Sequence, residues 1–189
     1  VTHFAYRLRP IFVGSMLRVF QQALGINAVL YYAPRIFQDM GMQNPMVQTV
    51  IMGVVNISFT LVAVFTVEKL GRKPLLIWGS IGMAAGAFGV ALTFGNPSLG
   101  TLTMLSIMVY SASFMFSWGP IAWVLIAELF PNTIRGAAVA IAVAFQWVFN
   151  FIVSSTFVPM FNMHLTPGDD FGHWFTYGLY GVICIIAAV

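Results

Sequence analysis

Residues 21–27 read Gln-Gln-Ala-Leu-Gly-Ile-Asn, and residues 31–34 read Tyr-Tyr-Ala-Pro. This stretch places three amides and two phenols inside an otherwise apolar run that is long enough to cross a bilayer. An amide without a partner in hydrocarbon costs several kcal/mol, so amides at that depth face a bundle interior or a watery cavity. Amides and phenols without a carboxylate suit a neutral, hydroxyl-rich solute. The first hypothesis is therefore a sugar pathway through a membrane.

The composition identifies an integral membrane protein. The sequence has 60% hydrophobic and 7% charged residues, with a mean hydropathy of +0.91. Soluble domains carry about 25% charged residues, so this chain has too few charges to cover a surface that faces water. A β-barrel is excluded, because its strands alternate over segments of about ten residues, whereas the apolar runs here are continuous and much longer.

Six apolar runs, each near or above the ~20 residues that a membrane-spanning helix needs, predict an all-α membrane protein with six transmembrane helices. In the fourth run we expect a kink at Pro120, since proline removes a helix donor and clashes with the preceding turn. The first and fourth helices are interrupted and each begins a triplet, as in a transporter built from a 3+3 inverted repeat. The expected helices are 11–32, 46–67, 75–94, 102–130, 137–158 and 171–189.

Basic residues gather on one side of the predicted membrane. The other side receives only Arg35, so the positive-inside rule places the basic loops and the N-terminus in the cytoplasm. This placement accounts for the net charge of +3 without a nucleic-acid partner. Arg18 lies inside the first run, where it can snorkel to the interface, and the sequence does not decide whether it has a role in coupling. The bases on the cytoplasmic side are Arg7, Arg9, Lys69, Arg72, Lys73 and Arg135.

The candidate site begins with Gln22, Asn27 and Tyr31. In an unbroken helix Gln22 and Asn27 would point about 140° apart. Both can therefore face one ligand only where the helix unwinds, and Gly25 between them permits this. Asn27 and Tyr31 are four residues apart and share a face. The alternative is that these amides only bond neighbouring helices.

Two further helices carry amides that could join the site. The fifth has Gln146 and Asn150 four residues apart, with Trp147 beside Gln146, and these two amides would face a cavity. The second has Asn56, for which hydrogen bonding between helices is an equally good explanation.

The fourth helix supplies the aromatic candidates Phe114, Trp118 and Trp123. An indole offers a flat apolar face and one N–H donor, which suits the ring and a hydroxyl of a sugar. Core packing is the simpler explanation for Trp118, whereas Trp123 follows Gly119-Pro120 by one turn.

Charged residues also gather at the predicted cytoplasmic helix ends. Glu68 and Glu128 are the acids on that side, and both lie close to arginines, Arg72 and Arg135. A topology signal explains the bases but not the two acids. We therefore expect a conformational latch, a charge cluster that forms and breaks between helix ends. The alternative is a set of exposed ion pairs with little energetic weight.

Enzyme chemistry has little support. The predicted membrane runs contain no nucleophile–base pair, phosphate-binding glycine loop or paired carboxylate. His164, Asp169, Asp170 and His173 form a loose group in the last outer loop, but their spacing is not specific for a metal and a solvated loop is expected. We expect no enzyme activity, no cofactor and no metal.

Several short motifs, taken together with their order and spacing, make this sequence similar to the sugar porter family of the major facilitator superfamily. Within that family it resembles the bacterial D-xylose/proton symporters. The match runs along nearly the whole chain. The motifs are Phe20-Gln21-Gln22, Gly25-Ile26-Asn27, Tyr31-Tyr32-Ala33-Pro34, Gly71-Arg72-Lys73-Pro74, Ser117-Trp118-Gly119-Pro120 with Trp123, Glu128-Leu129-Phe130-Pro131, Ile134-Arg135-Gly136 and Gln146-Trp147.

The resemblance implies that residues 1–189 form the C-terminal six-helix bundle of a twelve-helix transporter, with the N-terminal bundle and the C-terminal tail absent from this sequence. It implies that the charge network steadies an outward-open state through Glu68, Arg72, Glu128 and Arg135. It also implies a sugar site. In that site Gln21, Gln22, Asn27, Trp123 and Gln146 bind the sugar, Tyr31, Phe114, Gly119 and Trp147 line the pocket, and Asn56 lies nearby.

The function implied is transport of a monosaccharide of the D-xylose or D-glucose class across the cell inner membrane by alternating access. Its partners would be the sugar, a proton, the lipid bilayer and the N-terminal bundle. One alternative is an uncoupled facilitator, because a coupling acid would lie in the missing half. Another is a membrane binding or scaffold fragment that transports nothing. The sequence does not identify the sugar.

Overall fold

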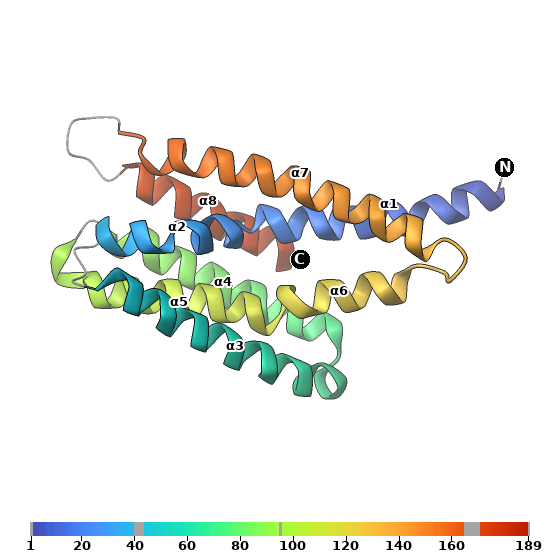
Figure 1. Cartoon of the computed structure of the whole chain (residues 1–189), viewed down its shortest axis with the longest axis horizontal. Coiled ribbons are helices and arrows are strands. Elements are labelled where there is room, and N and C mark those ends of the chain that lie inside the picture. Colours follow the sequence, from blue (N-terminus) through green and yellow to red (C-terminus); the bar gives the residue numbers. More distant parts are fainter. Residues whose placement is uncertain (1, 40–43, 95, 165–170, 189) are drawn as a thin grey trace.

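The computed structural model describes residues 2–39, 44–94, 96–164 and 171–188, and within these ranges its regular elements are all helices. They lie side by side along the long axis of the molecule (Figure 1). The predicted all-α fold is confirmed. The elements are α1 (Thr2–Ala23), α2 (Ile26–Asp39), α3 (Pro45–Leu70), α4 (Arg72–Thr93), the 3-10 turn η1 (Pro97–Leu99), α5 (Gly100–Phe116), α6 (Trp118–Leu129), α7 (Arg135–Phe161) and α8 (Phe171–Ala188).

Five segments of the described chain are long and apolar enough to cross a membrane. The expected first span, 11–32, is instead divided between α1 and α2, which follow one another along the bundle in Figure 1. α1 also begins at Thr2, well before residue 11, because a helix can continue beyond the apolar run that a bilayer requires. The five segments are Met46–Leu70, Arg72–Thr93, Gly100–Leu129, Arg135–Phe161 and Phe171–Ala188.

The break between α1 and α2 is centred on Gly25. Its φ of +78° lies in the left-handed region that glycine adopts without a steric penalty. Its N–H bonds the carbonyl of Gln22 at 2.9 Å, which closes a tight turn. A Cβ at this position would come within 2.6 Å of the Tyr180 ring on α8. The predicted unwinding at Gly25 is confirmed, and both the backbone and the neighbouring ring exclude a side chain.

The break between α5 and α6 lies at Ser117 rather than at Pro120, where the sequence predicted it. Ser117 has φ −127° and ψ −87°, outside the helical region. Pro120 falls in the first turn of α6, where backbone N–H groups have no partner within the helix, so the missing donor costs little there. The chain accommodates the proline by breaking one turn earlier.

Each broken helix donates a hydrogen bond to the backbone of the other beside its break. The hydroxyl of Tyr110 on α5 donates to the carbonyl of Leu24. The amide nitrogen of Gln21 on α1 donates to the carbonyl of Trp118 at 2.8 Å. Both donors are buried, so water cannot replace either bond. The two breaks are therefore tied together.

Glycines on α4 let it pack closely against α5. A Cβ on Gly86 would lie 2.7 Å from the backbone nitrogen of Tyr110, and one on Gly82 would lie 2.5 Å from the hydroxyl of Ser113. This agrees with the close-packing pair predicted at Gly82 and Gly86. α4 also packs along α8. It therefore supports the helix that carries the second break.

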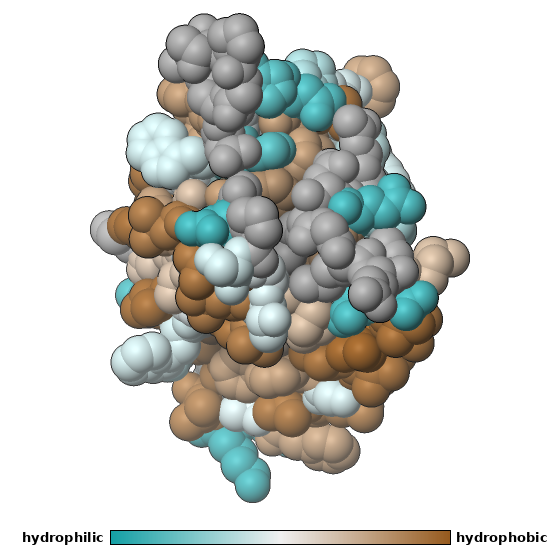
Figure 2. Space-filling model, turned by 90° about the vertical axis from the view of Figure 1, so that its left-hand side faces the viewer, coloured by the Kyte–Doolittle hydropathy of each residue, from teal (hydrophilic) through white to brown (hydrophobic). Residues whose placement is uncertain are grey.

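The outer faces of the bundle are apolar. Val54, Ile57 and Leu61 on α3 are exposed, as are Val148 and Ile152 on α7. Figure 2, which looks along the bundle, shows brown residues along its flanks and teal residues mainly around the end that faces the viewer. Such flanks suit a hydrocarbon environment, and together with the five spans they indicate a multi-pass membrane protein.

The Gly25→Ala variant is expected to lower the stability of the protein by about 2 kcal/mol or more. A left-handed backbone conformation destabilises alanine by roughly 1–2 kcal/mol relative to glycine, and the added Cβ would displace the Tyr180 ring. The measurement is the melting temperature in detergent. The matched control is Gly53→Ala, because nothing lies within 4 Å of a Cβ there. Equal melting temperatures for the two variants would contradict the assigned break.

Candidate functional site

Amides from α1, α2 and α7 meet at the first break. The Asn27 side-chain nitrogen donates to the oxygen of Gln22 at 2.6 Å and to the oxygen of Asn150 at 3.1 Å. The Asn150 nitrogen in turn lies 3.5 Å from the hydroxyl of Tyr31. The expectation that unwinding at Gly25 would bring Gln22 and Asn27 together is confirmed. The result is a hydrogen-bonded row of neutral polar groups without a carboxylate.

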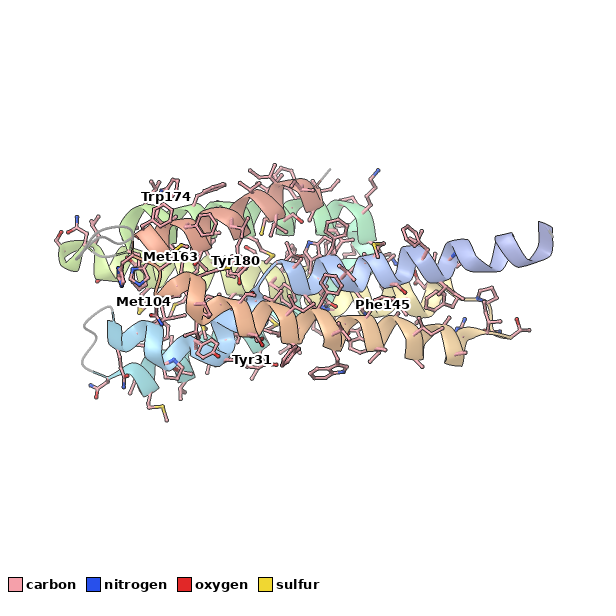
Figure 3. All side chains as sticks on the ribbon, turned by 90° about the horizontal axis from the view of Figure 1, so that it is seen from above. Tyr31, Met104, Phe145, Met163, Trp174 and Tyr180 are labelled. Atoms are coloured by element: carbon pink, nitrogen blue, oxygen red, sulfur yellow. The ribbon has the colours of Figure 1, made fainter. Side chains whose placement is uncertain are left out.

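The outer end of this row is open. Tyr31 is 56% exposed and lies on α2 beside α7 (Figure 3). Gln146 lies one turn before Asn150 on α7, and its side-chain oxygen is buried without a hydrogen-bond partner among the described residues. Trp147 next to it is exposed. A buried acceptor without a partner is an unsatisfied hydrogen-bonding group, which makes Gln146 a candidate to accept from a ligand hydroxyl.

A second polar group lies at the break between α5 and α6. The Gln21 nitrogen donates to the Trp118 carbonyl and lies 3.5 Å from that of Gly119, while the Gln21 oxygen accepts from the Arg18 Nη1 at 2.6 Å. The Arg18 guanidinium carbon lies 3.5 Å from the centre of the Trp123 ring. Arg18 does not snorkel to the interface, which the sequence left open: its exposed fraction is 0%, because it turns inward onto Gln21 and Trp123.

The aromatic candidates divide into core and surface. Trp118 and Phe114 are buried in the main hydrophobic core, and the Trp118 indole N–H donates to Ser80 at 2.7 Å. Trp123 is 50% exposed, with one face over Arg18. Core packing therefore accounts for Trp118 and Phe114 in this conformation, whereas Trp123 remains available to a ligand.

Asn56 forms a hydrogen bond between helices. Its side-chain oxygen accepts from the hydroxyl of Ser111 on α5 at 2.6 Å, and the residue is buried. This is the alternative that the sequence left open. Asn56 also borders a pocket of about 260 Å³ with Thr60 and Met115, so it lies at the edge of a cavity and apart from the amide row.

Sequence reasoning identified most of the amide row but missed two positions. Asn150 was expected to face a cavity but was not assigned to the site, although its four-residue spacing from Gln146 was the available signal. Arg18 was left without a role, because its contacts with Trp123 on a distant helix cannot be read from spacing.

The predicted charge network is present in part. Arg72 at the start of α4 and Glu128 near the end of α6 form an ion pair of 2.5 Å, and both side chains are half-exposed. Glu68 lies with Arg72 around a pocket of about 240 Å³. Arg135 donates to the carbonyl of Phe130 at 3.2 Å instead, which steadies the turn between α6 and α7.

The outer histidine and acid group is described only in part. Asp169 and Asp170 lie outside the described residues. The centre of the His173 ring lies 4.2 Å from the ring centres of both Phe94 and Phe161, so it packs among aromatic side chains at the start of α8. In the described ranges no three potential ligands come together to hold a metal ion.

These features define a multi-pass helical membrane protein whose neutral polar side chains gather at two helix breaks. Residues 2–189 match the family described as "Sugar (and other) transporter". The chain therefore belongs to the sugar transporter family. Relatives in this family are transporters rather than enzymes.

Individual relatives agree with this assignment. Over 95% of its length the chain is 47% identical to the D-xylose-proton symporter of Escherichia coli strain K12, of which it covers 37%. Over 98% of its length it is 40% identical to the glucose facilitated diffusion protein of Zymomonas mobilis, of which it covers 40%. A crystal structure of a D-xylose-proton symporter superimposes with a TM-score of 0.87 at 45% identity, over 98% of this chain and 42% of that one. The chain thus spans about two fifths of the length of these relatives and has the fold of half a major facilitator transporter.

The Gln21→Ala variant is expected to reduce stability by about 1–3 kcal/mol, since it leaves a buried Arg18 donor without its partner and removes the tie to Trp118. The measurement is the melting temperature in detergent. Gln38→Ala, which removes an exposed glutamine from α2, is the control and should melt like the parent protein. If Gln21→Ala also melts like the parent, Gln21 does not clamp the second break.

Proposed function

We propose that this chain is the C-terminal six-helix bundle of a transporter that moves a monosaccharide of the D-xylose or D-glucose class by alternating access. The observation that carries the proposal is the row Gln22–Asn27–Asn150 at a helix break inside a membrane-length bundle. Each amide both donates and accepts, so the row matches adjacent hydroxyls that do the same. The similarity to a D-xylose-proton symporter and a glucose facilitator supports this substrate class.

In the proposed site, Gln22, Asn27 and Gln146 bind the sugar hydroxyls and the open face of Trp123 packs against the ring. The buried, unpartnered oxygen of Gln146 and the half-exposed indole support these roles. The other members of the predicted set line or support the site. They are Gln21, Tyr31, Asn56, Phe114, Gly119 and Trp147.

The proposed orientation places the N-terminus of this chain in the cytoplasm of a cell whose inner membrane holds the protein. Figure 1 shows the N-terminus, the α3–α4 turn and the α6–α7 turn at the same end of the bundle. That end carries Lys69, Arg72, Lys73 and Arg135, in agreement with the positive-inside rule. The proposed partner is an N-terminal bundle that faces the amide row and completes the sugar site.

Proton symport is the proposed mode, because the relative with 47% identity is a proton symporter. Uncoupled facilitation is the second candidate, supported by the glucose facilitated diffusion protein at 40% identity. Proteoliposomes with a pH gradient and an equal sugar concentration on both sides separate the two, since only a symporter then accumulates sugar. Absence of any saturable sugar uptake by the full-length transporter would instead favour a binding or scaffold protein.

Removing one amide of the proposed sugar site, from the row or at Gln146, is expected to weaken sugar affinity by ~5- to 150-fold, the equivalent of about 1–3 kcal/mol for a buried group left without its partner. The variants are Gln22→Ala, Gln146→Ala and Asn150→Ala in the full-length transporter. Isothermal titration with D-xylose and D-glucose gives the affinities.

The control for these variants is Thr156→Val, because Thr156 is exposed on α7 and its hydroxyl bonds its own helix. Its sugar affinity should match that of the parent protein. Unchanged affinity in both glutamine variants would return the amides to a structural role and remove the main support for the sugar site.

The Arg72–Glu128 pair is proposed to act as a latch that forms in one conformation and breaks in the other. Glu128→Gln is expected to shift the conformational equilibrium by roughly 1–2 kcal/mol, within the usual range of coupling energies. Transport should therefore slow more than sugar binding weakens. Uptake rates and binding affinities of the full-length protein are compared, with Lys69→Gln at the same end as control. Equal losses in binding and uptake would place Glu128 in the sugar site instead.

A further inference from the structure

Arg18 is a charged side chain that is completely buried within the bundle. Its exposed fraction is 0%, and it lies on α1 one turn before Gln21. In the described part of the chain, the carboxylates Glu68 and Glu128 lie around Arg72 and not around Arg18. A buried cation is costly unless its surroundings compensate it, so its presence here needs an explanation in terms of the groups that it contacts.

Two contacts compensate part of that cost. Nη1 donates to the Gln21 oxygen at 2.6 Å, and the guanidinium carbon lies over the Trp123 ring, 3.5 Å from its centre. Nε and Nη2 have no hydrogen-bond partner among the described residues. The face of the indole therefore supplies a second stabilising contact, through its attraction for a cation. The guanidinium and the indole hold each other in place.

The contact with Gln21 also fixes which way its amide points. A guanidinium can only donate, so the Gln21 oxygen must face Arg18. A carbonyl can only accept, so the Gln21 nitrogen must face Trp118. These two partners leave a single orientation for the amide, and through it Arg18 is connected to the first turn of α6, the helix that carries Trp123.

We infer that Arg18 is a positioning residue for sugar binding, which sets the pose of the Trp123 indole and holds the first turn of α6 through Gln21. The inference rests on the proposed function, in which the open face of Trp123 packs against the sugar. Trp123 is half-exposed, and Arg18 lies over one face of its ring. Without the cation beneath it, the indole loses the contact that keeps its open face directed at the site.

A lysine could not perform the same task. Its ammonium is a point charge without a plane, so it cannot both lie flat against an indole and donate sideways to an amide with fixed geometry. The planar guanidinium combines these two contacts in one group. This is a physical reason for an arginine at this position in spite of its burial.

The test uses the full-length transporter and the variant Arg18→Met. Methionine removes the cation without leaving a buried charge behind, and it lowers the cost of placing this segment in a membrane, so folding is expected to persist. We expect the affinities for D-xylose and D-glucose, measured by isothermal titration, to fall about 3- to 30-fold, the range for a partly desolvated cation–π contact. Arg18→Gln, which can still donate to Gln21, should show a similar loss.

A double-mutant comparison shows whether Arg18 acts through Trp123. In a Trp123→Ala background, Arg18→Met should change the sugar affinity by no more than about 2-fold, close to the error of additivity. An equal loss in both backgrounds would mean that Arg18 acts independently of the indole and would overturn the inference. So would an unchanged affinity in the single variant Arg18→Met.

The indole can also be observed directly. In protein labelled with 5-fluorotryptophan, the ¹⁹F resonance of Trp123 is assigned by its absence in Trp123→Phe. This resonance should shift in Arg18→Met and stay in place in Ser15→Ala, a control one turn earlier on α1. An unmoved resonance in Arg18→Met would overturn the positioning role even if sugar binding by the parent protein were established. If the parent protein binds neither sugar but the Trp123 resonance still shifts in Arg18→Met, the result contradicts the proposed function and not the contact between Arg18 and Trp123.

Discussion

The two hydrogen bonds that tie the helix breaks together are the interaction on which the rest of the structure depends. Tyr110 on α5 bonds the backbone at the α1–α2 break, and Gln21 on α1 bonds the backbone at the α5–α6 break. Hydrocarbon offers no substitute for either donor. Each break is thus acceptable only in the presence of the other broken helix. The polar site at the breaks can exist in a membrane because these ties hold it.

The amides serve both as scaffold and as candidate ligand-binding groups, and their hydrogen-bond partners within the protein distinguish the two roles. Gln21 has partners on both ends of its amide and is buried, so its first task is to hold the second break. Gln146 has a buried oxygen without a partner. An amide with partners at both ends holds the shape of the site, whereas a buried acceptor without a partner can gain a hydrogen bond from a ligand.

Features set by neighbours along the chain could be predicted from the sequence, and features set by distant contacts could not. Gly25 between two amides predicted the unwinding. Acids beside bases at helix ends predicted a charge cluster, but the partner of Arg72 in it, Glu128, lies 56 residues away and is set by the fold. The second break fell at Ser117 because a proline is tolerated in a first turn. The burial of Arg18 depends on Trp123, more than a hundred positions away, and no local pattern contains that contact.

The reciprocal ties also have a consequence for biogenesis. The carbonyl of Leu24 accepts from Tyr110, which follows 86 residues later in the chain. The side chain of Gln21 donates to the carbonyl of Trp118, which follows 97 residues later. While the chain is being synthesised, the first broken helix therefore has unsatisfied polar groups that a bare bilayer cannot accommodate. It has to stay beside water or the insertion machinery until α5 and α6 emerge. Release into lipid is then a joint event for the two broken helices, since each supplies the other's hydrogen-bond partner.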